Sequence, residues 1–174
     1  MAGDRFQTMI EWVQSLDGDD KVRAGSVMSW QATASTLNEL VKHFNAITFG
    51  SDDPEAKRYR EVQLKKVIIG LLFEMDACLD LWAGELQKAD LLDQEIKDKK
   101  KEFKTACKKV GLDVLKQIRN GVAFHFTDYL KDPEAVVATY QQVDQITMDS
   151  INEILRAANF CGYAMRDKVT ESIS

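Results

Sequence analysis

Apolar residues recur at three- and four-residue spacing along nearly the whole chain, which is the period of an amphipathic α-helix. Phe6, Ile10 and Val13 share one face of a short first helix, and residues Asp17–Asp20 predict a turn that ends it. A second helix is expected from about Ser26 to Ile47. No segment alternates in the manner of a β-strand.

The third predicted helix is long and runs from Pro54 to about Lys88. Asp53 is suited to cap it, and proline is favoured in a first helical turn, where its missing N–H costs nothing. Its apolar stripe is wide enough for a central helix contacted on more than one side. The stripe includes Val67, Leu71, Met75, Cys78 and Trp82, with Ile68, Leu72 and Leu79 beside it.

A fourth helix is expected from roughly Leu91 to Val110, with Gly111 as its C-cap, and a fifth begins near Leu112. Asp132-Pro133 then restarts the chain in the same way as the earlier Asp-Pro pair. The apolar face beyond it drifts slowly, so the last segment is either one very long helix or two.

The fold class predicted is therefore all-α: an up-and-down helical bundle with long antiparallel helices, in which residues 1–174 form a single domain. The apolar fraction of 45% and the charged fraction of 29% are typical of a soluble globular protein. The longest helices are expected to bury part of their stripes against a second copy, which makes a homodimer the expected state.

The remaining composition narrows the class of protein. A net charge of −5 argues against a protein that coats nucleic acid over its whole surface. Cys78, Cys107 and Cys161 lack metal-ligand spacing and are expected to be buried free thiols in a reducing compartment. The N-terminus has no pattern of a secretory signal, and the longest apolar run is too short for a bilayer. We therefore expect a cytoplasmic protein that requires no metal or cofactor and is not in a membrane.

The most informative segment is Arg119–His125, in which an arginine followed by asparagine precedes a histidine by six positions. Histidine is the side chain best suited to move a proton at neutral pH, and the guanidinium fork matches phosphate oxygens. On an ideal helix, Arg119 and His125 lie about 120° apart and do not share a face. They would share a pocket if the long arginine side chain reaches round, if the helix loosens at Asn120-Gly121, or if a twofold axis passes close by. Structural interpretations stay open: His125 as a core or interface histidine, and Arg119 as a surface salt-bridge residue.

These residues resemble the R-x(4–6)-H motif of the HEPN superfamily, in which a polar residue commonly follows the arginine. The flanking residues Leu115–Ile118, Phe126 and Asp128 are similar to members found in abortive-infection and toxin systems. The resemblance implies a helical homodimer that acts as a metal-independent endoribonuclease. His125 would then serve as general base or acid, Arg119 would hold the scissile phosphate, and Asn120 would orient the phosphate or the histidine. The products would carry 2′,3′-cyclic phosphate and 5′-OH ends.

A lysine-rich segment precedes the motif. Between Glu95 and Arg119 there are nine basic and four acidic residues, in a chain that is acidic overall. Such a segment is able to follow an RNA backbone by releasing counterions, with Lys108, Lys109 and Lys116 nearest the motif as substrate-binding candidates. A solvated outer helix face is the alternative.

Four other residues carry weaker signals. Glu74 lies inside the long third helix, where it is a candidate to pair with Arg119 or orient His125, and Asp76 and Asp80 lie close to the same stripe. His43 has no second ligand at metal spacing and is interpreted as structural.

Three functions remain in view. The first is an RNA-cleaving toxin or phage-defence effector, with an antitoxin protein as a possible partner. The second is a non-catalytic dimerisation or adaptor module that binds a protein or nucleic acid, with His125 as packing. The third is a protein that binds nucleotide or RNA ends without cutting them.

Overall fold

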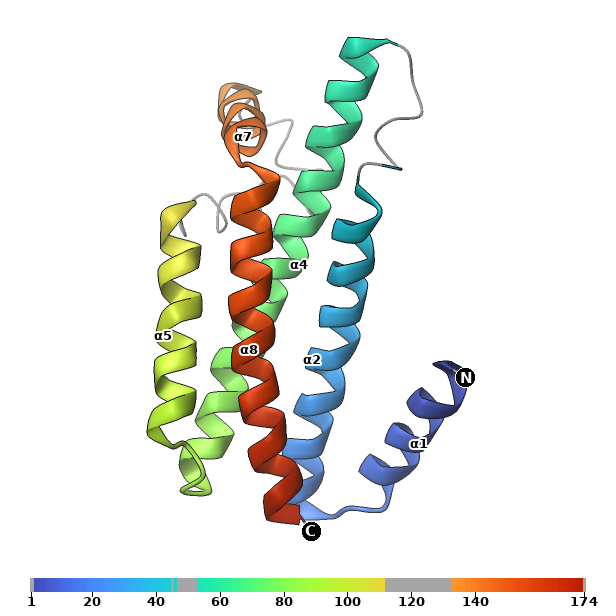
Figure 1. Ribbon diagram of the computed structural model, residues 1–174, viewed down its shortest axis with the longest axis vertical. Helices are drawn as coiled ribbons and strands as arrows, with labels where there is room; N and C mark the ends of the chain where they lie inside the picture. The colour runs from blue at the N-terminus through green and yellow to red at the C-terminus, as the bar shows by residue number, and fades with distance from the viewer. Residues whose placement is uncertain (1, 45, 47–52, 112–132, 174) are drawn as a thin grey trace.

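A computed structural model describes residues 2–44, 46, 53–111 and 133–173, and all six elements in them are helices (Figure 1). The all-α bundle predicted from periodicity is confirmed over these residues. The helices are α1 (Ala2–Gln14), α2 (Gly18–Lys42), α4 (Pro54–Lys88), α5 (Gln94–Lys109), α7 (Pro133–Gln145) and α8 (Met148–Ile173).

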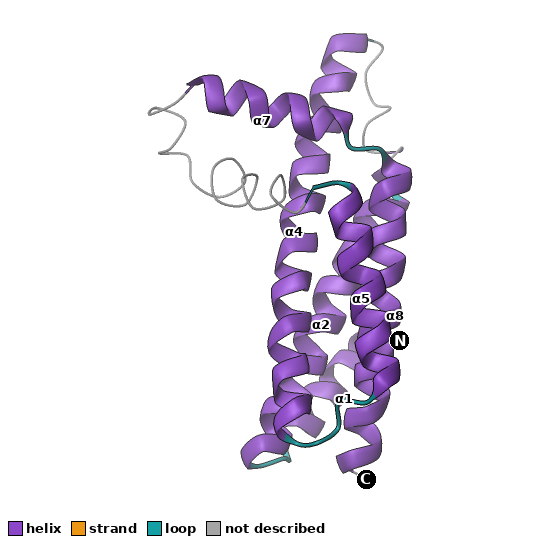
Figure 2. Cartoon of the chain, turned by 90° about the vertical axis from the view of Figure 1, so that its left-hand side faces the viewer, coloured by secondary structure: helices purple, strands orange, loops and turns teal. Residues whose placement is uncertain are grey.

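Four of the helices, α2, α4, α5 and α8, stand side by side along the long axis of the molecule, and each successive one runs opposite to the last (Figure 1). Helix α8 contacts the other three, and α1 packs on α2. Helix α7 lies across one end of the bundle and packs on α4 (Figure 2). The long α4 contacts α2, α7 and α8, which agrees with the central position expected from its wide stripe.

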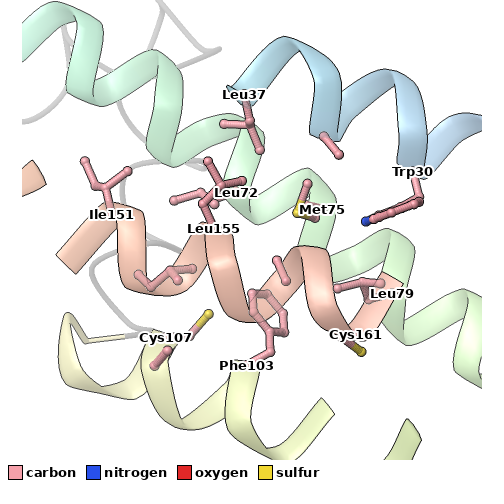
Figure 3. Close-up of a cluster of buried hydrophobic side chains, with 14 of the residues drawn as sticks. Trp30, Leu37, Leu72, Met75, Leu79, Phe103, Cys107, Ile151, Leu155 and Cys161 are labelled. Atoms are coloured by element: carbon pink, nitrogen blue, oxygen red, sulfur yellow. The ribbon is translucent and has the colours of Figure 1, made fainter. Parts of the chain in front are cut away.

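The core is built from the inward faces of these four helices, as Figure 3 shows. Trp30 and Leu37 of α2 meet Leu72, Met75 and Leu79 of α4. From the other side come apolar side chains of α5 and α8. These are Phe103, Cys107, Ile151, Leu155 and Cys161, and each is at most 4% exposed.

Helices α2 and α8 approach closely where Trp30 meets Gly162. A Cβ atom placed on Gly162 would lie 2.0 Å from Cε2 and 2.3 Å from Nε1 of the Trp30 indole. The indole therefore lies against the backbone of α8 in a space that only glycine leaves open. The same ring is 6.0 Å from the ring of Trp82 and packs edge-on against Tyr163 at 5.2 Å, so one side chain joins α2, α4 and α8.

Several helix boundaries follow the local signals in the sequence. Helix α4 begins at Pro54, and the Asp53 side chain accepts a hydrogen bond of 3.0 Å from the N–H of Glu55, as predicted. Helix α5 ends at Lys109, and Gly111 takes the left-handed conformation that glycine favours (φ 80°), which confirms its expected capping role. Helix α5 begins at Gln94, three residues later than expected. Asp93 caps this start, because its carboxylate accepts a hydrogen bond from the N–H of Ile96 at 3.0 Å.

The predicted turn at Asp17–Asp20 is wrong. Helix α1 ends at Gln14, Asp17 has the extended backbone of an N-cap residue, and α2 begins at Gly18 rather than near Ser26. Asp19 and Asp20 lie in its first turn, where carboxylates are favoured by the helix dipole. The aspartates thus begin a helix rather than end one. Helix α2 also ends earlier than expected, at Lys42, and Ile47 lies outside the described residues.

The last segment forms two helices rather than one. The helix is interrupted between Gln145 and Met148, where the N–H of Ser150 donates a hydrogen bond to the hydroxyl of Thr147 at 3.2 Å. A threonine hydroxyl in this position satisfies an N–H that would otherwise lack an intrahelical partner. The break lets α7 turn away from the bundle while α8 continues along it.

The buried face of α4 is rotated from the stripe that the spacing favoured. Val67 was placed on that stripe, yet its side chain is 49% exposed, and Leu71 and Cys78 are only partly buried. Met75 and Trp82 of the expected stripe are buried, and so are Ile68, Leu72 and Leu79, which were expected beside it. Together with Leu86 they form the centre of the buried face, each at most 2% exposed. Either set of positions has helical spacing, and only the neighbouring helices choose between them.

We predict that Gly162→Ala destabilises the protein, because the new methyl group overlaps the Trp30 indole. Overpacking of this kind costs about 1–3 kcal/mol of unfolding free energy, which urea unfolding followed by circular dichroism measures. Gly84 of α4 is the matched control, since a Cβ atom placed there meets nothing within 4 Å. Gly84→Ala is expected to stabilise the protein by roughly 0.5–1 kcal/mol. Equal effects of the two substitutions would contradict the close approach.

Candidate nucleic-acid interface

The predicted catalytic residues lie outside the part of the chain that the structure describes. Arg119, Asn120 and His125, together with Lys116, belong to the segment 112–132. The described chain reaches that segment at Gly111, on the end of α5, and leaves it at Pro133, the first residue of α7.

Lys108 and Lys109 occupy the last turn of α5, directly before this segment. Both are exposed, and cations are favoured there because the free carbonyl groups give a helix C-terminus partial negative charge. Lys109 pairs with Glu153 of α8 and keeps 59% of its side chain exposed. Lys108 has no ion-pair partner among the described residues. Of the three substrate-binding candidates, Lys108 and Lys109 therefore lie together at the end of α5, and Lys116 lies outside the described residues.

The lysine-rich segment does not form a continuous cationic surface on α5. Lys100 lies 2.9 Å from Asp80 of α4, and Lys104 bridges Asp80 at 2.9 Å and Asp76. These four residues form an α4–α5 ion-pair cluster that joins the two helices. Their cations are neutralised within the fold, so only the outward lysines, such as Lys108, are open to a phosphate backbone.

Opposing effects set the pKa values of Asp80 and Lys104 in the α4–α5 ion-pair cluster. Burial raises the pKa of the Asp80 carboxyl, but hydrogen bonds from Lys104 and Lys100 outweigh it and leave this pKa below its ordinary value. Burial likewise lowers the pKa of Lys104, and the bonds to Asp76 and Asp80 more than restore it. Each group is therefore held in its charged form.

A second polar cluster, which the sequence analysis missed, anchors α7 to α4. Lys66 is only 7% exposed, and its Nζ donates to the hydroxyl of Tyr140 at 3.0 Å while lying 4.7 Å from the ring centroid. Gln63 donates to the same hydroxyl at 3.3 Å. Lys65 donates to the main-chain carbonyl of Asp144 at 3.1 Å, and the carboxylate of Asp144 pairs with Arg58.

A sequence signal for this α7 anchor exists. Lys65 and Lys66 stand immediately before the apolar run that begins at Val67, three positions from Ile68 and Ile69 on the buried face of α4. Lysine at such a position needs a polar partner, because a buried ammonium group without one is costly. The sequence does not reveal that the partner is Tyr140, 74 residues away.

The four weaker candidates from the sequence lie in different surroundings. Asp76 and Asp80 belong to the α4–α5 ion-pair cluster, so their role is structural. Glu74 is exposed on α4, and any pairing with Arg119 or His125 lies outside the described residues. His43 caps the C-terminus of α2, is 53% exposed, and lies 3.1 Å from the Glu39 carboxylate.

The three cysteines are free thiols, as predicted, although Cys78 is only partly buried. Burial raises the pKa of Cys107 to about 12 and that of Cys161 to about 11, so neither is a thiolate at neutral pH. Within the described ranges, no group of three or more histidine, cysteine or carboxylate side chains is placed to hold a metal ion. No helix there is long and apolar enough to cross a membrane.

Comparison of the chain with known proteins finds no matching family, no matching curated protein and no matching solved structure. The resemblance to the HEPN superfamily therefore depends on the seven-residue motif together with helical class.

We predict that stability falls in acid through the α4–α5 ion-pair cluster. A carboxyl with a lowered folded-state pKa contributes stability above its unfolded pKa of about 4, and this contribution is lost as pH falls through the folded value. Asp80→Asn should therefore flatten the decline in unfolding free energy below about pH 4. Because Asp80 is 47% exposed, solvent limits the difference to roughly 0.5–1 kcal/mol.

Asp98→Asn is the control, because Asp98 accepts a hydrogen bond from Gln94 of its own helix and has no ion pair to another described helix. Urea unfolding between pH 7 and pH 3 measures both variants. An acid profile of Asp80→Asn that matches the parent would show that the cluster contributes nothing.

We further predict that Tyr140→Phe loosens α7. The substitution keeps the ring under Lys66 but removes the hydroxyl that accepts from Lys66 and Gln63, at a cost of about 1–2 kcal/mol in unfolding free energy. Tyr59→Phe, on an exposed ring of α4, should change it by less than about 0.5 kcal/mol. Urea unfolding compares the two, and equal stability would contradict a buried hydroxyl contact.

Proposed function

We propose that the chain is a metal-independent endoribonuclease of a toxin or phage-defence type, acting as a homodimer. The observation that carries this proposal is the Arg119-Asn120…His125 motif, the only place in the chain where a histidine follows an arginine at the spacing typical of HEPN ribonucleases. The exposed Lys108 and Lys109 at the end of α5 support it, because they put positive charge next to the motif in sequence.

Cleavage follows from the chemistry of these side chains. The His125 imidazole takes the proton from the ribose 2′-OH, the 2′-oxygen attacks phosphorus, and the bond to the 5′-oxygen breaks. The leaving 5′-oxygen takes up a proton from an imidazolium or from water. Arg119 stabilises the charge that develops on the phosphate, and Asn120 orients the phosphate or the imidazole. General acid–base help of this kind contributes on the order of 10²–10⁴ in rate.

The proposed partners follow from the same assignment. RNA is the substrate, and a second copy completes a cleft to which each protomer contributes one motif. An antitoxin protein would mask that cleft until the nuclease is needed. The cellular site of action proposed is the cytoplasm.

We predict that His125→Ala lowers RNA cleavage by about 10²-fold or more in EDTA, with 2′,3′-cyclic phosphate ends on the products of the parent protein. Gel electrophoresis of labelled RNA measures the rate, and treatment of the products with a phosphatase specific for cyclic phosphate identifies the ends. His43→Ala is the matched control, since it removes the other histidine, which is exposed at the end of α2. Absence of cleavage by the parent protein, or equal cleavage by both variants, would overturn the proposal.

A second candidate is a non-catalytic module that binds a protein or nucleic acid, including RNA ends. It is favoured by the apolar neighbours of His125, which are Ile118, Val122, Phe124 and Phe126. The melting temperature of His125→Ala separates the two. Truncation of a packing histidine lowers the unfolding free energy of the protein by about 1–3 kcal/mol, whereas truncation of a catalytic histidine leaves the melting temperature nearly unchanged.

A further inference from the structure

The outer face of α8 carries two exposed aromatic side chains beside an amide and a cation. Phe160 is 52% exposed and Tyr163 is 43% exposed. Arg156 and Asn159 precede them at helical spacing, so that the four residues stand at positions i, i+3, i+4 and i+7 of one helix. Side chains at this spacing are neighbours on a helix surface. The four residues therefore form one contiguous patch.

A groove between α2 and α8 includes all four of these side chains (Figure 1). Its volume is about 630 Å³, which is within the range of small-ligand sites. Asn38 of α2 also lines the groove, and the amide nitrogen of Asn159 donates to the side-chain oxygen of Asn38 at 3.3 Å. We call these residues of the groove the α8 aromatic patch: Asn38, Arg156, Asn159, Phe160 and Tyr163.

One atom of the patch has an unmet hydrogen-bonding requirement. The side-chain oxygen of Asn159 is enclosed and accepts no hydrogen bond in the described part of the chain. An enclosed acceptor without a partner is costly. A rotation of this amide that meets the N–H of a ligand is therefore favoured.

Both aromatic rings are held by neighbouring side chains. Tyr163 packs edge-on against Trp30 of the core at 5.2 Å, and the guanidinium of Arg166 lies 5.0 Å from the Tyr163 ring centroid. The ammonium group of Lys99 lies 5.9 Å from the ring centroid of Phe160. Cations beside aromatic rings favour both the stacking of a nucleic-acid base and the approach of its phosphate. The patch is therefore a preformed aromatic surface with positive charge at its edges.

The charges inside the groove nearly cancel. Its carboxylates are Asp149 and Glu153, and Glu153 is already paired with Lys109 of α5. Asp149 lies in the first turn of α8, two helical turns before Arg156. Arg156 forms no ion pair with a described residue, so its guanidinium is open to a phosphate. A nearly neutral groove with one open cation suits an uncharged ring whose phosphate stays at the rim.

We propose that the α8 aromatic patch binds unpaired bases of single-stranded RNA. A base stacks on the rings of Phe160 and Tyr163, and its polar edge meets the two amides. The adjoining phosphate meets Arg156. The base must be unpaired, because in a duplex its edge is bonded to the partner strand and its faces are covered by neighbouring bases. Stacking on an aromatic ring tolerates any base, since every base has a π-face.

The inference rests on the proposed function and names its substrate class. Glu153 stands one helical turn before Arg156 and is paired with Lys109, in the last turn of α5. The described chain ends two residues later, at Gly111, where it enters the segment that carries the proposed catalytic residues. A strand bound at the patch is thus able to follow α8 to the exposed lysines at the end of α5.

Binding of a short, fluorescein-labelled 2′-O-methyl oligoadenylate to the full chain, followed by fluorescence anisotropy, tests the patch. This oligomer has no 2′-OH proton to lose, so the proposed chemistry does not cleave it and binding is measured apart from cleavage. Phe160→Ala should weaken binding about tenfold or more, because a stacked base loses its ring. Phe160→Tyr keeps a ring and should bind within about twofold of the parent protein. Tyr59→Ala is the control, because it removes an exposed ring of α4 and should leave binding unchanged.

Salt dependence separates stacking from charge. Arg156→Gln should lower the slope of log Kd against log salt concentration by about 0.7, which corresponds to one phosphate of a single strand. Phe160→Ala should leave that slope unchanged while it weakens binding at every salt concentration. Thermal melting verifies that each variant is folded.

Several results would overturn the inference. They are no binding by the parent protein, unchanged binding by Phe160→Ala, and equal loss in Phe160→Ala and Tyr59→Ala. Adenosine monophosphate that displaces the oligomer as effectively as unlabelled oligomer does, at equal concentration, would show a mononucleotide site instead.

The inference and the nuclease fail separately. Binding that depends on Phe160, in a protein that never cuts ordinary RNA, would leave the patch standing and remove the nuclease. Cleavage of ordinary RNA at the parent rate by Phe160→Ala, with unchanged binding, would do the reverse.

Discussion

The bundle depends on one close approach, that of the Trp30 indole to the backbone of α8 at Gly162. Because glycine has no Cβ, the ring lies close against the helix backbone and also reaches Trp82, so three helices meet around one side chain. A buried tryptophan removes a large apolar area from water and, at its contacts, fixes the separation of the helices that touch it. The indole N–H groups of Trp30 and Trp82 meet no acceptor in the described part of the chain, so packing rather than hydrogen bonding stabilises this layer.

Around this layer, α5 and α7 are attached by different means, and the difference bears on function. Helix α5 buries Phe103 against α8 but reaches α4 through lysines that bridge carboxylates, and α7 is anchored to α4 through Lys66 and Tyr140. Much of the positive charge that suggested an RNA-binding helix is therefore neutralised inside the fold. The cations that remain open lie at the outer surface and at the end of α5, where Lys108 precedes the segment that carries the proposed catalytic residues.

Local chemistry could be predicted where a residue acts on its own turn of helix. Asp53 and Gly111 were recognised because capping requires particular side chains or a positive φ, whatever the rest of the chain does. The same reasoning misplaced Asp17, because an aspartate cluster after a helix suits the start of the next one as well as a turn. The slowly drifting apolar face left open whether the last segment is one helix or two, and the Thr147 hydroxyl caps a new helix there. The proposed catalytic motif was recognised by residue spacing alone.

The sequence by itself determined the helical class, the helix ends marked by Asp53 and Gly111, and the identity of the proton-transferring and phosphate-binding candidates, because periodicity and capping are local properties. Only the tertiary structure decided which face of each helix is buried, since Val67 and Ile68 both fit a helical stripe and neighbouring helices select between them. It also decided that Lys104 meets Asp80 and that Phe160 lies on the surface of the single chain. Such pairings depend on how helices that are far apart in the sequence pack together, and the spacing of residues within one helix does not show which other helix it contacts.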